Sequence, residues 1–205
     1  MREKGLIFNS EMVRAILDGR KTQTRRPIKW KQTRFTEIGE REDGSKWPWS
    51  EDAEHACDFW HPCPFGAVGD RIWVRETWNK YGGLLTYRAD HDWIDDMRKE
   101  TVCTAKWVPS IHMPRWASRI LLEITDVRVE RLNAISEEDA TAEGVPPAGS
   151  LLPDYLGTFL TPKGDFATAK VAFQRLWESI YGEESWKANG WVWVIEFKRV
   201  EGGAA

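Results

Sequence analysis

One long segment, from Arg119 to Arg131, constrains the fold of this chain most. Its apolar residues occupy even positions in the first half and odd positions in the second: Ile120, Leu122 and Ile124, then Val127 and Val129. Because side chains alternate between the two faces of a strand, this change of parity predicts a β-bulge near Thr125-Asp126. A bulge bends a strand, so we expect a curved sheet of the kind that forms a small barrel.

The other periodic segments are short and separated by long Pro-, Gly- and Trp-containing stretches. Helices are predicted at 10–18, 136–143 and 167–181, and strands at 22–26, 71–76 and 191–199. The stretches between them read as insertions at about 31–66, 79–118 and 145–166. With 205 residues and no long linker, we expect a single α+β domain over 1–205, built on a small, mainly antiparallel barrel.

Composition excludes several classes of protein. The formal charge of -3 argues against a general polyanion binder, so any contact with RNA must be local. The three cysteines cannot all pair, and the start of the chain lacks the apolar stretch of a secretory signal, which together predict a cytoplasmic location. The longest apolar run, 191–195, is far below the roughly 20 residues that a membrane span requires.

The predicted strand at 22–26 has an unusual composition. It follows a helix that should end at Gly19, and it carries threonine, glutamine and arginine where a buried strand would carry Val, Ile or aromatic residues. Hydroxyl, amide and guanidinium groups at these positions indicate the polar floor of a pocket. We therefore expect the chemistry of the protein in this segment.

Three residues in and near this segment have complementary chemistry. Thr24 is a candidate nucleophile, but its hydroxyl needs an adjacent base. Lys21 can be that base if burial, or the charges of Arg25 and Arg26, lower the pKa of its ammonium. Glu143 should lie in the last turn of a helix, where the negative end of the dipole disfavours a second negative charge and favours a general acid. The alternative interpretation is a surface lysine, a strand threonine and an exposed helix glutamate.

Three further features are weighed beside this set. A run of basic residues between Arg20 and Arg34 contains no acid and is either a solvated face or an RNA contact. Cysteines 57, 63 and 103, with His55, His61 or His112, do not show the paired clusters of a structural zinc site, so we predict no metal. Glu76 and Trp78, on or just after the 71–76 strand, are candidates for lining a pocket, although an ion pair is the commoner role of an inward glutamate.

The motifs resemble those of the ASCH domain family, the activating-signal-cointegrator homology domains. The resemblance is carried by Ile16-Leu17-Asp18-Gly19-Arg20-Lys21-Thr22-Gln23-Thr24-Arg25-Arg26, by the segment from Gly69 to Trp78, and by Val194-Ile195-Glu196-Phe197. It is similar in particular to the longer versions found in bacteriophages and prophages. The resemblance implies a PUA-like β-barrel.

The same resemblance implies a function. Small bacterial members are N4-acetylcytidine amidohydrolases that use a Lys, a Thr and a Glu without a metal or cofactor, and the motif spacing carries these roles onto Lys21, Thr24 and Glu143. The implied substrate is an N4-acylated cytidine nucleoside. Substrate-binding roles are expected for a polar and aromatic set: Arg20, Arg25, Arg26, Glu76 and Trp78. The alternative is an RNA-binding module or single-strand ribonuclease of the same fold.

Overall fold

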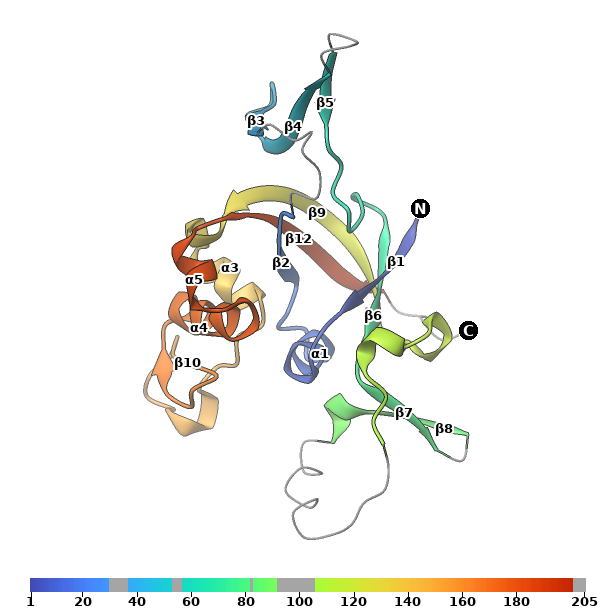
Figure 1. The fold of residues 1–205 in the computed structure, drawn as a ribbon. Coiled ribbons are helices and arrows are strands. Elements are labelled where there is room, and N and C mark those ends of the chain that lie inside the picture. Colours follow the sequence, from blue (N-terminus) through green and yellow to red (C-terminus); the bar gives the residue numbers. More distant parts are fainter. Residues whose placement is uncertain (30–36, 53–56, 82, 92–105, 201–205) are drawn as a thin grey trace.

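A computed structural model describes residues 1–29, 37–52, 57–81, 83–91 and 106–200. The protein is an α+β structure, made mostly of sheets with a few short helices, as the sequence predicts (Figure 1). The largest sheet has the strand order β1 (Glu3–Ile7), β6 (Arg71–Arg75), β9 (Leu121–Arg131), β12 (Trp191–Val200) and β2 (Gln23–Pro27). Strands β1 and β6 pair in parallel, and the other three pairings are antiparallel.

The predicted bulge is present in β9. Its pairing with β12 skips Thr125, because Glu196 lies opposite Asp126 whereas Phe197 lies opposite Ile124. The extra residue reverses the parity of the strand. As a result, Ile124 before the bulge and Val129 after it belong to the same apolar core. Figure 1 shows that β9 and β12 are long and curved.

Strand β12 is buried on both faces, which explains its continuous apolar sequence. One face, with Trp193, Ile195 and Phe197, packs in the core that also contains Val13 and Ile16 of the first helix. The other face, with Val192 and Val194, packs in a second core under the later helices.

The two edges of this sheet, β1 and β2, approach each other. Arg26 of β2 donates a hydrogen bond from Nη2 to the carbonyl oxygen of Ile7 in β1, with 2.7 Å between the two atoms. The strand β1 itself was not predicted, because its sequence, Glu3 to Ile7, carries only two large apolar residues at its end. The curvature of the sheet thus places the polar strand β2 near the start of the chain.

The helices are close to their predicted positions. Helix α1 (Ser10–Leu17) is capped by Asn9, α3 (Glu137–Ala142) by Ser136 and α4 (Ala169–Tyr181) by Thr168. A further short helix, α5 (Glu183–Lys187), follows Gly182 and was not predicted. Among the described helices, none is both long and apolar enough to cross a membrane.

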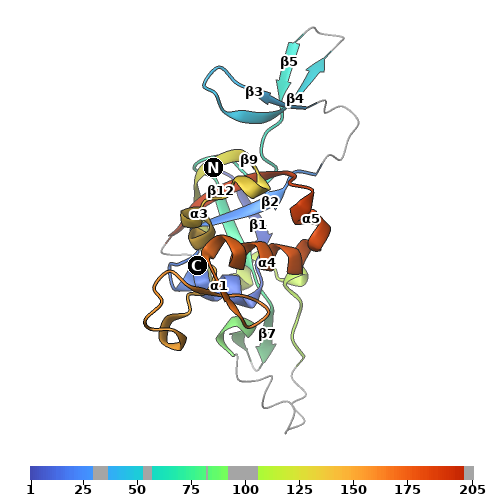
Figure 2. The same ribbon diagram turned by 90° about the vertical axis from the view of Figure 1, so that its left-hand side faces the viewer.

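The expected insertions contain regular structure that their sequences do not reveal. Strands β3 (Glu37–Glu40), β4 (Lys46–Asp52) and β5 (Cys57–Trp60) form a small sheet, and β7 (Trp78–Tyr81) and β8 (Leu84–Tyr87) form a hairpin. In both views these two units project from opposite ends of the main sheet (Figures 1 and 2). Strands β10 (Phe159–Leu160) and β11 (Phe166–Ala167) form a third pair. Short 3-10 turns span Arg88–Asp90, Ser110–His112, Arg115–Ala117, Leu132–Ala134 and Gly149–Leu151.

Candidate functional site

The site begins where helix α1 ends. Gly19 adopts a φ of 74°, a left-handed conformation that costs glycine little, so the helix stops there as predicted. The backbone N–H groups of Arg20 and Lys21 then both donate to the carbonyl oxygen of Ala15, at 2.8 and 2.9 Å. These two bonds fold the chain back against α1 and fix the direction in which the Lys21 side chain leaves the backbone.

The C-terminal end of α3 packs directly on Lys21. The backbone N–H of Thr22 donates to the carbonyl oxygen of Ala142, at 2.9 Å. Gly144 follows with a φ of 85°, and a Cβ atom at this position would lie 2.7 Å from the Cβ of Lys21. The absence of a side chain at Gly144 therefore permits the close approach that brings Glu143 to Lys21.

Lys21 and Glu143 form a buried pair. The Nζ atom of Lys21 lies 2.8 Å from Oε2 of Glu143 and 2.8 Å from the Glu143 carbonyl oxygen, and the two side chains are 0% and 3% exposed. Desolvation lowers the pKa of the Lys21 ammonium. The contact with Glu143 raises this pKa but only partly offsets the desolvation, and the charges of Arg26 and Arg25 lower the pKa further. A lysine with a lowered pKa is suited to accept a proton.

Arg25 holds the other oxygen of the same carboxylate. Its side chain is fully buried, with Nη1 at 3.4 Å from Glu143 Oε1 and Nη2 at 2.8 Å from Asp139 and 3.0 Å from Glu130. The interpretation of Lys21 as a surface lysine and of Glu143 as an exposed helix residue is therefore wrong. Arg25 instead acts as a clamp that orients the Glu143 carboxylate.

Thr24 lies in a cavity that Glu143 also lines. It is 2% exposed, and it lines a cavity of about 20 Å³ together with Arg25, Arg26 and Glu143. Side chains of α1 and α4 complete the walls of this cavity, among them Met12, Leu176 and Tyr181. Within the part of the chain that the structure describes, Lys21 Nζ bonds to Glu143 and not to Thr24. A cavity of this size holds about one water molecule.

The basic run after Arg20 does not form one solvated face. Arg20 donates to the carbonyl of Gly144 and to Asp18, and Arg26 donates to Ile7. Lys21 and Arg25 are buried, so of the described members only Lys29 is strongly exposed. Trp30, Lys31 and Arg34 of the expected patch lie outside the described residues.

Glu76 and Trp78 are found elsewhere. The Glu76 carboxylate is 1% exposed and receives two hydrogen bonds from Arg119, at 2.9 and 3.1 Å. Trp78 packs in a small core with Met113 and Ala117. The structure does not bring either residue into the cavities described in this section, so their predicted role in substrate binding gains no support from geometry.

The carboxylates that hold Arg25 were not predicted. Asp139 and Glu130 both bind Arg25, and neither was singled out from the sequence as a site residue. Asp126, Arg128 and Glu130 alternate with the apolar residues of β9, and Arg128 contacts both acids. This alternation of charges on one face of β9 is the signal that indicates the network, although β12 lies between β9 and the strand β2 that carries Arg25.

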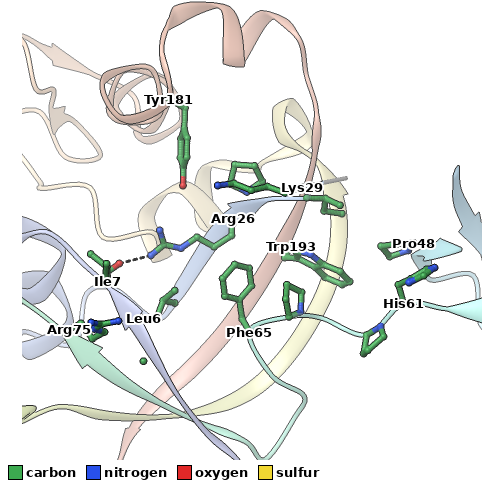
Figure 3. Close-up of a pocket in the computed structure, with 15 residues that line it drawn as sticks. Leu6, Ile7, Arg26, Lys29, Pro48, His61, Phe65, Arg75, Tyr181 and Trp193 are labelled. Atoms are coloured by element: carbon green, nitrogen blue, oxygen red, sulfur yellow. Dashed lines mark hydrogen bonds between the residues drawn. The ribbon is translucent and has the colours of Figure 1, made fainter. Parts of the chain in front are cut away.

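A second, larger cavity lies on the other side of Arg26. It has a volume of about 670 Å³ and is formed between the edge strands β1 and β2, the chain around Phe65 and the start of β12 (Figure 3). We call it the edge cavity; its lining side chains include Ile7, Arg26, Lys29, His61, Phe65, Arg75, Tyr181 and Trp193. Arg26 and Tyr181 line both the edge cavity and the small cavity of Thr24.

The cysteines form no metal site in the described part of the chain. A search of those residues finds no cluster of three or more His, Cys, Asp or Glu side chains able to hold a metal ion. Cys63 is buried, and burial raises the pKa of its thiol. His55 and Cys103, two of the weighed zinc ligands, lie outside the described residues.

Comparisons with known proteins give no relative for this chain. No protein-family model matches it, and neither the curated proteins nor the solved structures contain a match. The resemblance to the ASCH family thus stays a prediction, and the site has to be interpreted from its own geometry.

Proposed function

We propose that the protein is a metal-independent amidohydrolase that removes the acyl group from N4-acylated cytidine. The observation that carries the proposal is the buried pair of Lys21 and Glu143, 2.8 Å apart, with Thr24 in the adjoining cavity. A fully buried lysine with a lowered pKa beside a carboxylate and a hydroxyl is an arrangement suited to proton transfer. The ASCH resemblance of the surrounding motif supplies the substrate class.

The hydrogen bonds of Lys21 suit the neutral amine that a base requires. A neutral amine has two N–H groups and one lone pair, and Nζ has two acceptors, both on Glu143. The lone pair then remains to accept the proton of the Thr24 hydroxyl. Thr24 lines the cavity beside Glu143, so a short movement of its side chain would bring the hydroxyl into contact with the Lys21 amine.

The reaction then follows in two stages. The Thr24 oxygen attacks the acyl carbonyl as Lys21 takes its proton, and the tetrahedral intermediate collapses with cleavage of the C–N4 bond. The proton passes from Lys21 to Glu143 across their 2.8 Å contact, and Glu143 delivers it to the departing amine of cytosine. Water next hydrolyses the acyl ester of Thr24, which releases the carboxylic acid and regenerates the hydroxyl.

Access to Thr24 requires side chains to move. The cavity beside Thr24 holds about one water, and a cavity of about 70 Å³ lies on another side of Glu143. Met12 and Leu176 line both, and rotation of these flexible side chains would join the two spaces. The small volume favours short acyl groups such as acetyl.

The alternative function, single-stranded RNA binding or cleavage, draws less support from the site. It was suggested by the basic run after Arg20, but Arg25 is fully buried among three carboxylates.

We propose the PUA-like barrel of the ASCH resemblance as the fold, since the edge strands β1 and β2 approach each other through Arg26.

A hydrolysis assay tests the proposal. Purified protein is incubated with N4-acetylcytidine and with longer N4-acyl analogues, and release of cytidine is followed by chromatography. We expect turnover by the wild type, highest for the acetyl compound, and loss of turnover in Lys21→Ala. The exposed residue Lys163 provides a matched control, and Lys163→Ala should retain wild-type turnover. Absence of turnover with every acyl group, or equal turnover in Lys21→Ala, would contradict the function.

A further inference from the structure

The edge cavity has the charge expected of a site for an anion. Three cationic side chains line it, Arg26, Lys29 and Arg75, and no aspartate or glutamate lines it within the described ranges of the chain. Its volume of about 670 Å³ lies within the range of small-molecule sites, about 300–1,000 Å³. The protein as a whole is acidic, with a formal charge of -3, so this concentration of positive charge is local.

The two arginines of the edge cavity keep donors without acceptors. Arg26 bonds to the carbonyl oxygen of Ile7 and Arg75 to that of Ile111, and neither has a carboxylate partner in the described part of the chain. Among the described residues, the Nε atoms of both side chains have no hydrogen-bond partner. An arginine without a carboxylate partner is suited to bind an anionic group through its remaining N–H donors.

Planar apolar side chains lie across the same cavity. Figure 3 shows Phe65 between Arg26 and the Pro48–His61 side of the pocket, with Tyr181 descending from α4 toward Arg26. Trp193 also borders the pocket but is only 3% exposed, so Phe65 and Tyr181 provide the accessible rings. Aromatic faces bind bases and sugars of nucleotides by stacking and contact, whereas a simple inorganic anion gains nothing from them. The combination of cations and rings fits a phosphorylated nucleoside.

The edge cavity adjoins the proposed catalytic site through two shared residues. Arg26 and Tyr181 line both cavities, so a ligand in the edge cavity lies next to the space occupied by Thr24 and Glu143. We infer that the edge cavity binds the phosphate-bearing body of a cytosine nucleotide, so that the substrate class is N4-acylated cytidine monophosphate rather than the free nucleoside. The cytosine part of this inference rests on the proposed function; the nucleotide part rests on the cavity alone.

A binding experiment tests the nucleotide part without any catalysis. Calorimetry at fixed, low salt measures the affinity of the protein for cytidine 5′-monophosphate, cytidine and inorganic phosphate. We expect cytidine 5′-monophosphate to bind at least about tenfold more tightly than either of the others, since a charge-assisted phosphate contact adds to the stacking. Equal affinities for the nucleotide and cytidine, or for the nucleotide and phosphate, would overturn the inference.

Variants locate the binding. Lys29→Ala and Arg75→Met should each weaken binding of cytidine 5′-monophosphate while leaving that of cytidine unchanged, whereas Lys163→Ala should alter neither. Lys29 is exposed, so its removal tests the cavity even if Arg75→Met fails to fold. Undiminished nucleotide binding in both variants overturns the inference. Binding of an oligocytidylate more than tenfold more tightly than the mononucleotide also overturns it, because that result would indicate RNA as the ligand.

Kinetics separate this inference from the proposed function. If it is correct, N4-acetylcytidine 5′-monophosphate has a lower KM than N4-acetylcytidine, and Lys29→Ala removes the difference. Hydrolysis of both compounds with the same KM would overturn the inference and leave the proposed function standing. Hydrolysis of neither, with nucleotide binding that depends on Lys29, would refute the proposed function and uphold the nucleotide site.

Discussion

Two glutamates are almost completely buried in the part of the chain that the structure describes, and they are held in different ways. Glu76 receives two hydrogen bonds from Arg119. Arg119 also pairs with Asp90, and its guanidinium carbon lies 4.1 Å from the ring centroid of Tyr87. Glu143 instead faces a lysine, with the guanidinium of Arg25 on its other oxygen. Burial raises the pKa of Glu76, and Arg119 opposes this effect; burial lowers the pKa of Lys21.

The difference separates a fixed ion pair from a pair that can exchange a proton. An arginine keeps its charge at any relevant pH, so Arg119 is a permanent cation beside Glu76 and holds the chain around Trp78 in place. A desolvated lysine can lose its proton, and the cavity beside Glu143 provides a space in which that proton can be transferred to another group. Burial of a carboxylate is therefore common to both regions, and the identity of its cation distinguishes the pair that we propose to be catalytic.

The largest expected effect contrasts the two glutamates directly. Glu143→Gln should lower kcat for N4-acetylcytidine by about 10²–10⁴-fold, because the amide cannot deliver a proton to the leaving amine. Glu76→Gln, an identical change at a site equally buried, should leave kcat near the wild-type value. Turnover assays on both variants check this contrast, and equal losses in the two would show that burial alone matters.

The next effect concerns stability. Arg119→Met leaves Glu76 buried without its main partner, and we expect a loss of about 3–5 kcal/mol in the free energy of unfolding. Lys21→Met should cost less, because Arg25 still contacts Glu143 at 3.4 Å. Urea unfolding measures both. The exposed pair of Arg115 and Glu3 provides the control: Arg115→Met should change the unfolding free energy by about 0–1 kcal/mol. A loss in Lys21→Met larger than in Arg119→Met would contradict this ranking.

The pH dependence should differ between the two regions. The base must be the neutral amine, so kcat/KM should rise about tenfold per pH unit up to the pKa of Lys21, which lies below the usual lysine value of about 10.4.

Between the pKa of Lys21 in the folded protein and the usual lysine value, the unfolded chain binds a proton that the folded protein does not, so the free energy of unfolding should rise with pH. For Glu76, burial raises the pKa in the folded protein above that in the unfolded chain, so its contribution to the free energy of unfolding is lost as pH rises through the folded pKa. A rate that falls as pH rises toward 9 would refute the role of Lys21.

The smallest effect tests how α3 is seated on Lys21. Gly19 and Gly144 both have positive φ angles, but only at Gly144 would a Cβ meet another residue, 2.7 Å from the Lys21 Cβ. Gly19→Ala should therefore cost only the left-handed strain, about 1–2 kcal/mol, with turnover retained. Gly144→Ala should cost more and also reduce kcat, because α3 and Glu143 must shift. Unfolding and turnover of the two variants check this, and equal turnover would argue against the close packing.

Local signals in the sequence predicted much of the fold. The positions of α1 and α3, the glycine that ends α1 and the bulge in β9 each depend on a few neighbouring residues, and each is present. Strand β1 was missed because its partner, β6, is distant in sequence and its own residues show no alternation. The small sheet of β3, β4 and β5 was missed because its segment shows no regular alternation of apolar residues, although Ile38 and Trp47 pack against the main core.

The site was predictable in its members but not in its geometry. Motif spacing singled out Lys21 and Thr24, and a helix signal placed Glu143 at the end of α3. The contact between Lys21 and Glu143 depends on the close approach at Gly144, which no local pattern specifies. The same holds for Arg25, because its three carboxylates come from β9 and α3, more than a hundred residues away along the chain.

The most direct test of the central claim is the turnover of N4-acetylcytidine by Thr24→Val and Thr24→Ser. Valine has the shape of threonine without its hydroxyl, and Thr24 is buried at a position where shape matters, so the two variants separate packing from chemistry. The account predicts that Thr24→Ser retains measurable turnover, whereas Thr24→Val, folded by circular dichroism, releases cytidine no faster than a protein-free solution. Wild-type turnover in Thr24→Val would contradict a threonine nucleophile at this site.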